Sequence, residues 1–253
     1  MLRNYENIEN KSVQDFYVSL YSNQSLEKER ELREKYSRLN HGVMTMQTAL
    51  NLLDTFIDPS DPDLDVPNSV HAYQTAERIR MKYPNNKQLQ ITGLIHDIGK
   101  VLFNFGEPNY FIVGDTYVLG AQIPNTVPYY HTIENPNKYA EYGIYKPHCG
   151  LENLTLSWGH DEYLYTVLMG NREKHKLEKK YMDIIRYHSF YPWHSREEYK
   201  HLLQNGDSYT LCNVKMFNQF DLYSKPDSKN ISAGVKNYYK KLITEIFPQP
   251  LNW

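Results

Sequence analysis

The sequence contains little cysteine. Cys149 and Cys212 are the two copies among 253 residues, and their spacing is not that of a paired metal site. We therefore expect neither a disulfide framework nor a structural zinc site. A reducing compartment is the expected location. The start of the chain has no apolar core of signal-peptide length, and no apolar run approaches the roughly 18 residues of a membrane span. A cytoplasmic protein without membrane contact is the prediction.

An excess of positive charge is also missing. Lys and Arg total 28 against 30 Asp and Glu, so the formal net charge is -2. Nucleic acids select strongly basic surfaces, so we expect no nucleic-acid partner. Hydrophobic residues make up 40% of the chain and charged residues 23%, which is typical of a folded protein. Without repeats or a long linker, the chain is expected to form a single domain over residues 1–253 and to be a monomer.

Helix-type apolar spacing dominates the sequence. Residues 25–40 form a charged segment that begins at Ser25, a residue type that caps helices. Pro and Asp residues then interrupt the pattern at 58–68 and predict a loop. Further helical patterns cover residues 44–57, 69–83, 88–105, 151–169, 178–191, 195–205, 209–224 and 232–247. The segment at 195–205 begins with Ser195 and has Glu198 three positions later, which is the spacing of a capping box.

One short region departs from this pattern. After Gly106, the stretch "YFIVGDTYVLGA" indicates two short strands around a Gly114–Asp115 turn. The predicted fold class is therefore all-α, with a small β-hairpin insertion near 110–120.

The helix expected at 88–105 carries an unusual polar group. Its apolar residues form one continuous stripe, and His96, Asp97 and Lys100 fall within roughly a 100° arc on the other side. Gly93 lies in the same arc, and a glycine inside a helix is tolerated where something approaches closely. A solvated face with an Asp97–Lys100 ion pair is the simpler interpretation, but the apolar flanks on both sides indicate a buried helix.

More ligand-type residues lie in aromatic or apolar surroundings, namely His71, His160, His188 and Asp221. One such histidine is usually a buried structural residue, whereas six ligand-type residues together are harder to explain in that way. Four imidazoles and two carboxylates suit iron, manganese, zinc or cobalt. Six protein ligands would saturate one metal, whereas two metals that share a carboxylate keep positions open for substrate. Because adjacent helical residues point about 100° apart, His96 can bind one metal while Asp97 lies between two.

The acidic segment "DPSDPDLD" at residues 58–65 precedes His71 closely, so it is expected near the site; a solvated acidic loop is the alternative. A phosphate site would instead require arginines, helix N-termini or glycine-rich amides. An acidic lining with Lys100 and Asp115 suits a neutral compound with many hydroxyls, because carboxylates accept hydrogen bonds from hydroxyl groups.

Several of these segments closely resemble the myo-inositol oxygenases, a divergent branch of the HD-domain superfamily of all-helical metalloproteins. They are "DPSDPDLDVPNSVHAYQTAE", "GLIHDIGKVL", "FGEPNYFIVGDTYVLGA", "YKPHCGL", "LSWGHDEYLY", "RYHSFYPWH" and "FNQFDLYSK". The resemblance extends from "LRNY" to "PLNW", with departures in the loop at 121–142 and a shorter amino-terminal lead. It implies a single HD-domain-like helical bundle. "SWGHDEY" and "HSFYPWH" are its specific motifs, whereas His-Asp alone is not specific.

The resemblance also implies roles for individual residues. One iron would be bound by His71, His96 and Asp221, the other by His160 and His188, and Asp97 would bridge both. Substrate contacts would fall on Arg3, Asp58, Ser60, Asp61, Lys100, Gly114, Asp115, His188 and Ser189. Catalytic roles would fall on Lys100 and Asp97, with Lys100 as the hydrogen-bond partner of a substrate oxygen.

The implied reaction is cleavage of the myo-inositol ring by dioxygen to give D-glucuronate. A mixed-valent Fe(II)/Fe(III) pair would be the active cofactor, and no organic cofactor is expected. An HD-type metal-dependent phosphohydrolase could use the same six ligands with a metal-bound hydroxide. A metal-holding binding protein without activity is the second alternative. The scarcity of basic residues near the site disfavours the first alternative, and the intact ligand and substrate positions disfavour the second.

Overall fold

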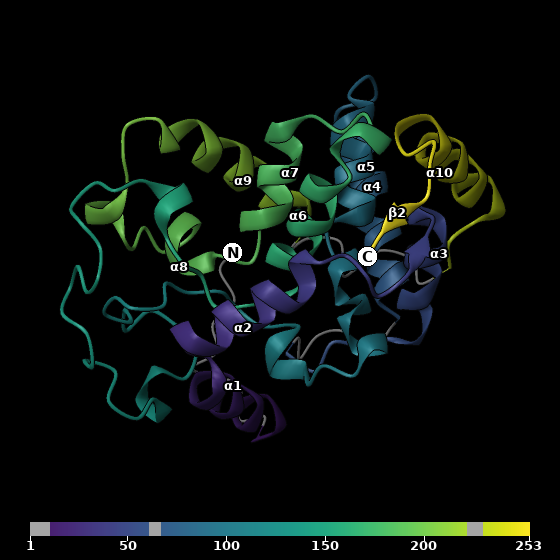
Figure 1. Cartoon of the computed structure of the whole chain (residues 1–253). Helices are drawn as coiled ribbons and strands as arrows, with labels where there is room; N and C mark the ends of the chain where they lie inside the picture. Colours follow the sequence, from purple (N-terminus) through teal and green to yellow (C-terminus); the bar gives the residue numbers. More distant parts are fainter. Residues whose placement is uncertain (1–10, 61–66, 222–229) are drawn as a thin grey trace.

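Helices make up most of the computed structural model, which describes residues 11–60, 67–221 and 230–253. Its α-helices are α1 (Lys11–Asn23), α2 (Leu26–Ser37), α3 (Met46–Leu52), α4 (Asn68–Lys82), α5 (Lys87–Ile95), α6 (His160–Gly170), α7 (Lys179–Tyr187), α8 (Tyr191–His194), α9 (Asp207–Asp221) and α10 (Ala233–Ile246). Helices α4, α5, α6, α7 and α9 pack against one another in the middle of the molecule (Figure 1). The predicted all-α class is confirmed.

A small antiparallel sheet joins β1 (Val43–Met44) to β2 (Leu251–Asn252). The region near 110–120 instead contains the 3-10 helix η4 (Asn109–Phe111), followed by a single bridge between Val118 and Leu156. Backbone groups of this region bond to distant segments, as when the Leu119 N–H donates to the Thr155 carbonyl at 2.8 Å. The predicted position of the hairpin was therefore wrong, because these extended residues pair with other parts of the chain.

The helix expected at 88–105 is interrupted at the polar residues. Helix α5 ends at Ile95, and the 3-10 helix η3 (Ile98–Phe105) follows, so His96 and Asp97 lie at the junction. A Cβ atom at Gly99 would lie 1.9 Å from the His160 carbonyl oxygen, so η3 is in close contact with the start of α6. This tight packing brings Asp97 beside His160.

Gly93 has a packing role that differs from the prediction. A Cβ atom there would lie 2.7 Å from Ile79 Cδ1, so the space beside Gly93 is filled by α4 and is not open to a ligand. The helix start at Ser25 is confirmed, since its side chain accepts a hydrogen bond from Lys28 N. The helix predicted at 195–205 was wrong, because α8 ends just before Ser195.

The main hydrophobic core surrounds the polar junction. Ile91, Leu94, Ile95 and Ile98 are inaccessible to solvent, as expected for a helix that is buried on every side. The polar residues that follow are buried as well, which excludes the interpretation of a solvated polar face. No helix within the described ranges is both long enough and apolar enough to span a bilayer.

Candidate metal centre

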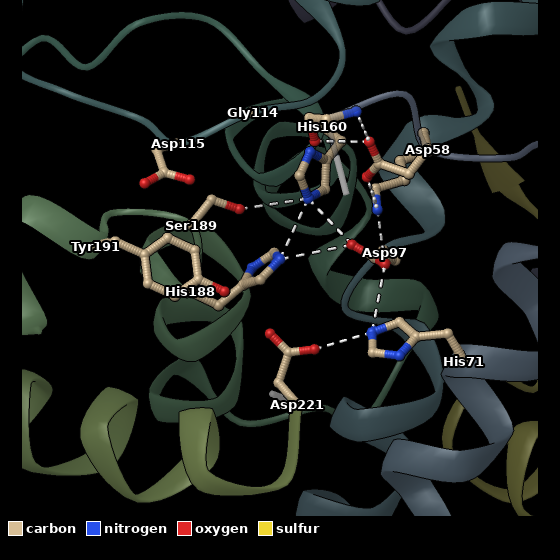
Figure 2. Close-up of a pocket in the computed structure, with 12 residues that line it drawn as sticks. Asp58, His71, Asp97, Gly114, Asp115, His160, His188, Ser189, Tyr191 and Asp221 are labelled. Atoms are coloured by element: carbon tan, nitrogen blue, oxygen red, sulfur yellow. Dashed lines mark hydrogen bonds and ion pairs between the residues drawn. The ribbon is translucent and has the colours of Figure 1, made fainter. Parts of the chain in front are cut away.

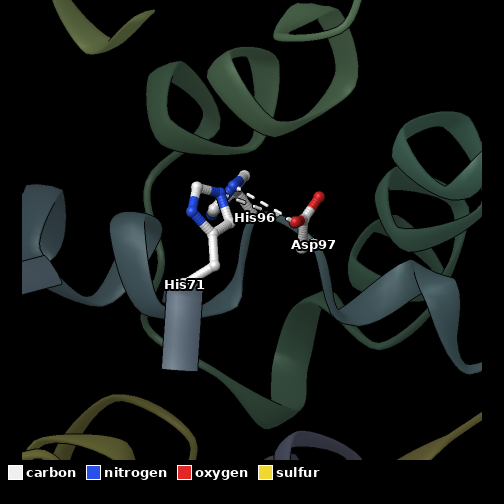
Figure 3. A group of neighbouring side chains, drawn as sticks. All are labelled: His71, His96 and Asp97. Atoms are coloured by element: carbon white, nitrogen blue, oxygen red, sulfur yellow. Dashed lines mark ion pairs between the residues drawn. The ribbon is translucent and has the colours of Figure 1, made fainter. Parts of the chain in front are cut away.

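Six ligand-type side chains from different helices converge inside the core. They are His71 on α4, His96 and Asp97 at the α5–η3 junction, His160 at the start of α6, His188 directly after α7, and Asp221 at the end of α9. All six are at most 7% exposed. Buried imidazoles and carboxylates are expensive unless they are paired or coordinate a metal, so their convergence requires an explanation. We call these six residues the His/Asp cluster (Figures 2 and 3).

Asp97 lies between two groups of histidines. Its Oδ1 is 3.1 Å from His160 Nε2 and 3.6 Å from His188 Nε2. Its Oδ2 is 3.6 Å from His96 Nε2 and 3.9 Å from His71 Nε2. Each carboxylate oxygen therefore faces a different pair of imidazoles.

The two groups differ in composition. On one side, Asp221 Oδ1 lies 2.9 Å from His71 Nε2 and 3.3 Å from His96 Nε2. We call this the three-residue side. On the other, His160 Nε2 and His188 Nε2 lie 3.2 Å apart, and we call this the two-histidine side.

Hydrogen bonds to carbonyl oxygens set the tautomers of three of the rings. His96 Nδ1 donates to the Gly93 carbonyl at 2.8 Å, and the Nδ1 atoms of His160 and His188 donate to the carbonyls of Ile112 and Ile185 at 2.7 Å. In a neutral imidazole the Nε2 atom is then an acceptor, which is the form that binds metals. Metal-binding histidines commonly donate their other ring N–H to such a carbonyl, so these three hydrogen bonds are compatible with a metal site.

This donor set fits a metal ion on each side of Asp97. When His160 and His188 are neutral and donate through Nδ1, their facing Nε2 atoms are both acceptors, and the carboxylate between the groups adds further acceptors. Two nitrogen ligands about 2.1 Å from one ion, at roughly a right angle, are about 3 Å apart, close to the observed separation. Two combinations could each hold an ion, namely His71, His96 and Asp97, and Asp97, His160 and His188.

A buried lysine lies beside the His/Asp cluster. Lys100 Nζ donates to Asp97 Oδ2 and to Asp58 Oδ2, both at 2.8 Å. Burial disfavours the charged carboxylates, but the Lys100 ammonium holds the pKa of Asp58 below and that of Asp97 well below the usual range. Burial disfavours the charged ammonium, yet the two carboxylates raise the pKa of Lys100. Lys100 is therefore a charged hydrogen-bond donor and not a base.

A cavity opens onto both sides of Asp97. Its lining residues are Asp58, Ser60, His71, Asp97, Lys100, Gly114, Asp115, His160, His188, Ser189, Tyr191 and Asp221. Figure 2 shows Asp115, Ser189 and Tyr191 beyond His188, away from His71. Seven of the nine predicted substrate positions line this cavity, whereas Arg3 and Asp61 lie outside the described residues.

Three residues near the site were missed by the sequence analysis. Asn68 Nδ2 donates to Asp97 Oδ2 at 3.1 Å, and Tyr191 lines the cavity. Tyr17 donates from α1 to Asp115 Oδ1 at 3.1 Å. Asn68 precedes His71 by three residues, a helical spacing that could have indicated it. No sequence signal links Tyr17 to Asp115 across 98 residues.

Comparison with known proteins identifies related sequences. A sequence model for the family described as myo-inositol oxygenase matches residues 10–253. The chain is 40% identical to inositol oxygenase of Danio rerio, over 98% of this chain and 93% of that protein. It is 42% identical to inositol oxygenase 1 of Arabidopsis thaliana, over 96% and 80% respectively. It is 43% identical to inositol oxygenase of Dictyostelium discoideum, over 99% and 89%.

Proposed function

Because the chain belongs to the myo-inositol oxygenase family and is an oxygenase enzyme, we propose that it cleaves the ring of myo-inositol with dioxygen to give D-glucuronate. Dioxygen takes up four electrons in this reaction; one of its oxygen atoms enters the product and the other leaves as water. The observation that carries the proposal is the position of Asp97, whose two oxygens face two separate histidine groups beside a cavity.

Two iron ions in a mixed-valent Fe(II)/Fe(III) state are the proposed cofactor. The residues that would hold one ion are His71, His96 and Asp221, those that would hold the other are His160 and His188, and Asp97 would be shared. When bound, the irons supply the positions at which dioxygen and substrate oxygens bind and through which electrons pass. The two-histidine side has fewer protein ligands, which leaves more positions for substrate.

The cavity lining supports a neutral polyhydroxy substrate. Asp58, Asp115 and Ser189 present oxygen atoms that accept hydrogen bonds from hydroxyl groups. Among the described lining residues, Lys100 is the only lysine or arginine. Its charge already compensates the carboxylates of Asp58 and Asp97. A phosphate ester would bring further negative charge into this acidic site, so the phosphohydrolase alternative is not favoured. Arg3 and Asp61 complete the proposed substrate contacts.

Lys100 is proposed to bind a substrate oxygen. Its raised pKa keeps it charged, and a buried ammonium stabilises negative charge that develops on an oxygen more effectively than an exposed one. Asp58 holds the lysine from the opposite direction to Asp97, and Ser60 in turn donates to Asp58 Oδ1 through N and Oγ at 2.8 and 2.6 Å. The protein thereby orients the donor before substrate arrives.

Dioxygen uptake by the iron-loaded protein tests the proposed function. With myo-inositol present, we expect uptake of one dioxygen for each glucuronate formed, measured with an oxygen electrode and by product chromatography. Release of phosphate from model phosphate esters without uptake of dioxygen would contradict the proposal.

The variant Lys100→Ala tests the role of the lysine. Because Lys100 contacts a ligand without being one, we expect iron content to stay close to that of the wild type and kcat to fall about 10²–10³-fold. Metal analysis and dioxygen uptake measure both effects. Lys87→Ala is the control, since Lys87 is exposed and pairs with Glu245 far from the site. Loss of iron from Lys100→Ala would refute the assigned role.

A further inference from the structure

Asn68 contacts the carboxylate of Asp97 but is not among the residues that line the cavity. It is the first residue of α4 and is 1% exposed. Its Nδ2 donates to Asp97 Oδ2 at 3.1 Å, and its backbone N–H donates to the Phe56 carbonyl at 3.0 Å. The amide therefore approaches Asp97 from an anchored position at the start of a core helix.

The other half of the amide shows that this position is not optimised for stability. Asn68 Oδ1 is buried and has no hydrogen-bond partner among the residues that the structure describes. A buried carbonyl without a partner costs free energy of folding, and an apolar side chain of the same size would avoid that cost. The hydrogen bond that asparagine provides here and an apolar residue would not is the one from Nδ2 to Asp97 Oδ2.

Asp97 Oδ2 accepts hydrogen bonds from Lys100 and Asn68, and these two donors differ in their other contacts. Lys100 also contacts Asp58 and lines the cavity, so under the proposed function its ammonium is shared among Asp97, Asp58 and a substrate oxygen. Asn68 does not line the cavity. Its hydrogen bond to Asp97 is therefore not shared with substrate.

We propose that Asn68 is a positioning residue that keeps the Asp97 carboxylate oriented toward both histidine groups throughout the reaction. This inference rests on the proposed function. Rotation of the carboxylate would turn Oδ1 away from His160 and His188, because the two oxygens move together. With a donor on Oδ2 that is not shared with substrate, that rotation is opposed even when Lys100 also contacts a substrate oxygen.

The test compares Asn68→Leu with wild type and with Ser69→Ala. Leucine has a similar size and no donor, whereas Ser69, the next residue of the same helix, contacts Asp54 and not Asp97. We expect Asn68→Leu to retain two irons and a KM within about twofold of wild type, while kcat falls about 10–100-fold. Its electron paramagnetic resonance spectrum in the mixed-valent state should also change, since under the proposed function Asp97 would be a ligand of both ions.

Asn68→Asp provides a second measurement if the leucine variant does not fold. It has nearly the same shape but replaces the donor by a carboxylate next to Asp97 Oδ2, so the same spectral change and an equal or larger loss of kcat are expected. A kcat and spectrum equal to those of Ser69→Ala would overturn the role of Asn68, as would a change in KM alone. Absence of dioxygen uptake in the wild type would refute the proposed function instead.

Discussion

The two sides of Asp97 differ in how many protein groups they provide. The three-residue side uses the imidazoles of His71 and His96 and the carboxylate of Asp221, from α4, the α5–η3 junction and the end of α9. The two-histidine side uses only His160 and His188, from the start of α6 and the residue after α7. Under the proposed function, the side with more protein ligands would hold its ion more tightly, and the side with fewer would have more positions for substrate.

Support behind the two sides also differs. Glu162, two residues after His160, accepts hydrogen bonds from Arg186 Nε at 2.7 Å and Arg33 Nη1 at 2.8 Å. Arg186 in turn precedes His188 by two residues. This partly buried ion-pair network joins α6 to α7 and to α2, on the two helices that carry His160 and precede His188.

The shared carboxylate is the strongest test of the comparison. Because Asp97 faces both groups, Asp97→Ala should lower metal content on both sides and abolish dioxygen uptake. Metal analysis and an oxygen electrode measure this. Asp97→Asn is the companion variant, which keeps the shape of the side chain. A variant that kept two irons and normal turnover would show that the carboxylate is not shared.

Removing one histidine from each side should give unequal results. His188→Ala leaves one imidazole on its side, so we expect close to one iron per chain and no turnover. His71→Ala leaves His96 and Asp221, so the affinity for the ion on the three-residue side should fall by a smaller factor than the affinity lost in His188→Ala. Iron titrations followed by optical or calorimetric methods distinguish the two variants. Equal losses would mean that the two sides do not differ in holding their ions.

The ion-pair network predicts a pH-dependent effect on stability. Burial disfavours the Glu162 carboxylate, but Arg186 and Arg33 hold its pKa below the unfolded value near 4.5. Its contribution is therefore present above that pH and is lost as the pH falls through the lowered pKa of the folded state. Glu162→Gln should lower the free energy of unfolding by about 3 kcal/mol at neutral pH.

Denaturant unfolding at neutral and acidic pH checks this result, with the exposed pair of Glu34 and Arg38 as the reference. Glu34→Gln should change stability by less than about 1 kcal/mol. If the difference between wild type and Glu162→Gln did not shrink in acid, the pKa of Glu162 in the folded protein would not lie below its unfolded value.

A smaller effect is expected at the outer wall of the cavity. Tyr17 is fully buried and donates to Asp115 Oδ1, so Tyr17→Phe removes one orienting hydrogen bond from a proposed substrate contact. The loss of one such bond corresponds to about 1 kcal/mol, so KM should rise about 5-fold with little change in kcat. Steady-state kinetics test this, with Tyr21→Phe as the control because Tyr21 donates to the Pro128 carbonyl. A lower kcat at constant KM would place Tyr17 in the chemistry instead.

Local sequence patterns predicted some parts of the fold well and failed at others. The helix that begins after Ser25 was predictable because its cap and its period are both encoded within a few residues. The supposed hairpin near 110–120 failed because its extended residues bond to Thr155 and Ser189, far away in the sequence. Gly93 was misassigned for a similar reason, since its neighbour Ile79 belongs to another helix.

The site shows the same division. The sequence marked the histidines and aspartates of the His/Asp cluster, because six ligand-type residues in apolar or aromatic surroundings are harder to explain as structural residues than one. It did not single out Asn68, for which the spacing of three residues from His71 was the available signal, nor Tyr17, which donates to Asp115 from α1.

The sequence by itself determined the helical class and the chemical identity of the six ligand-type side chains, since periodicity and side-chain chemistry are local properties. Only the tertiary structure decided that Oδ1 of Asp97 faces one pair of imidazoles and Oδ2 the other. It also decided which neighbours hold that carboxylate in place. These distances depend on how α4, α6, α7 and α9 pack around the break after α5, and packing sums contacts between residues that are distant along the chain.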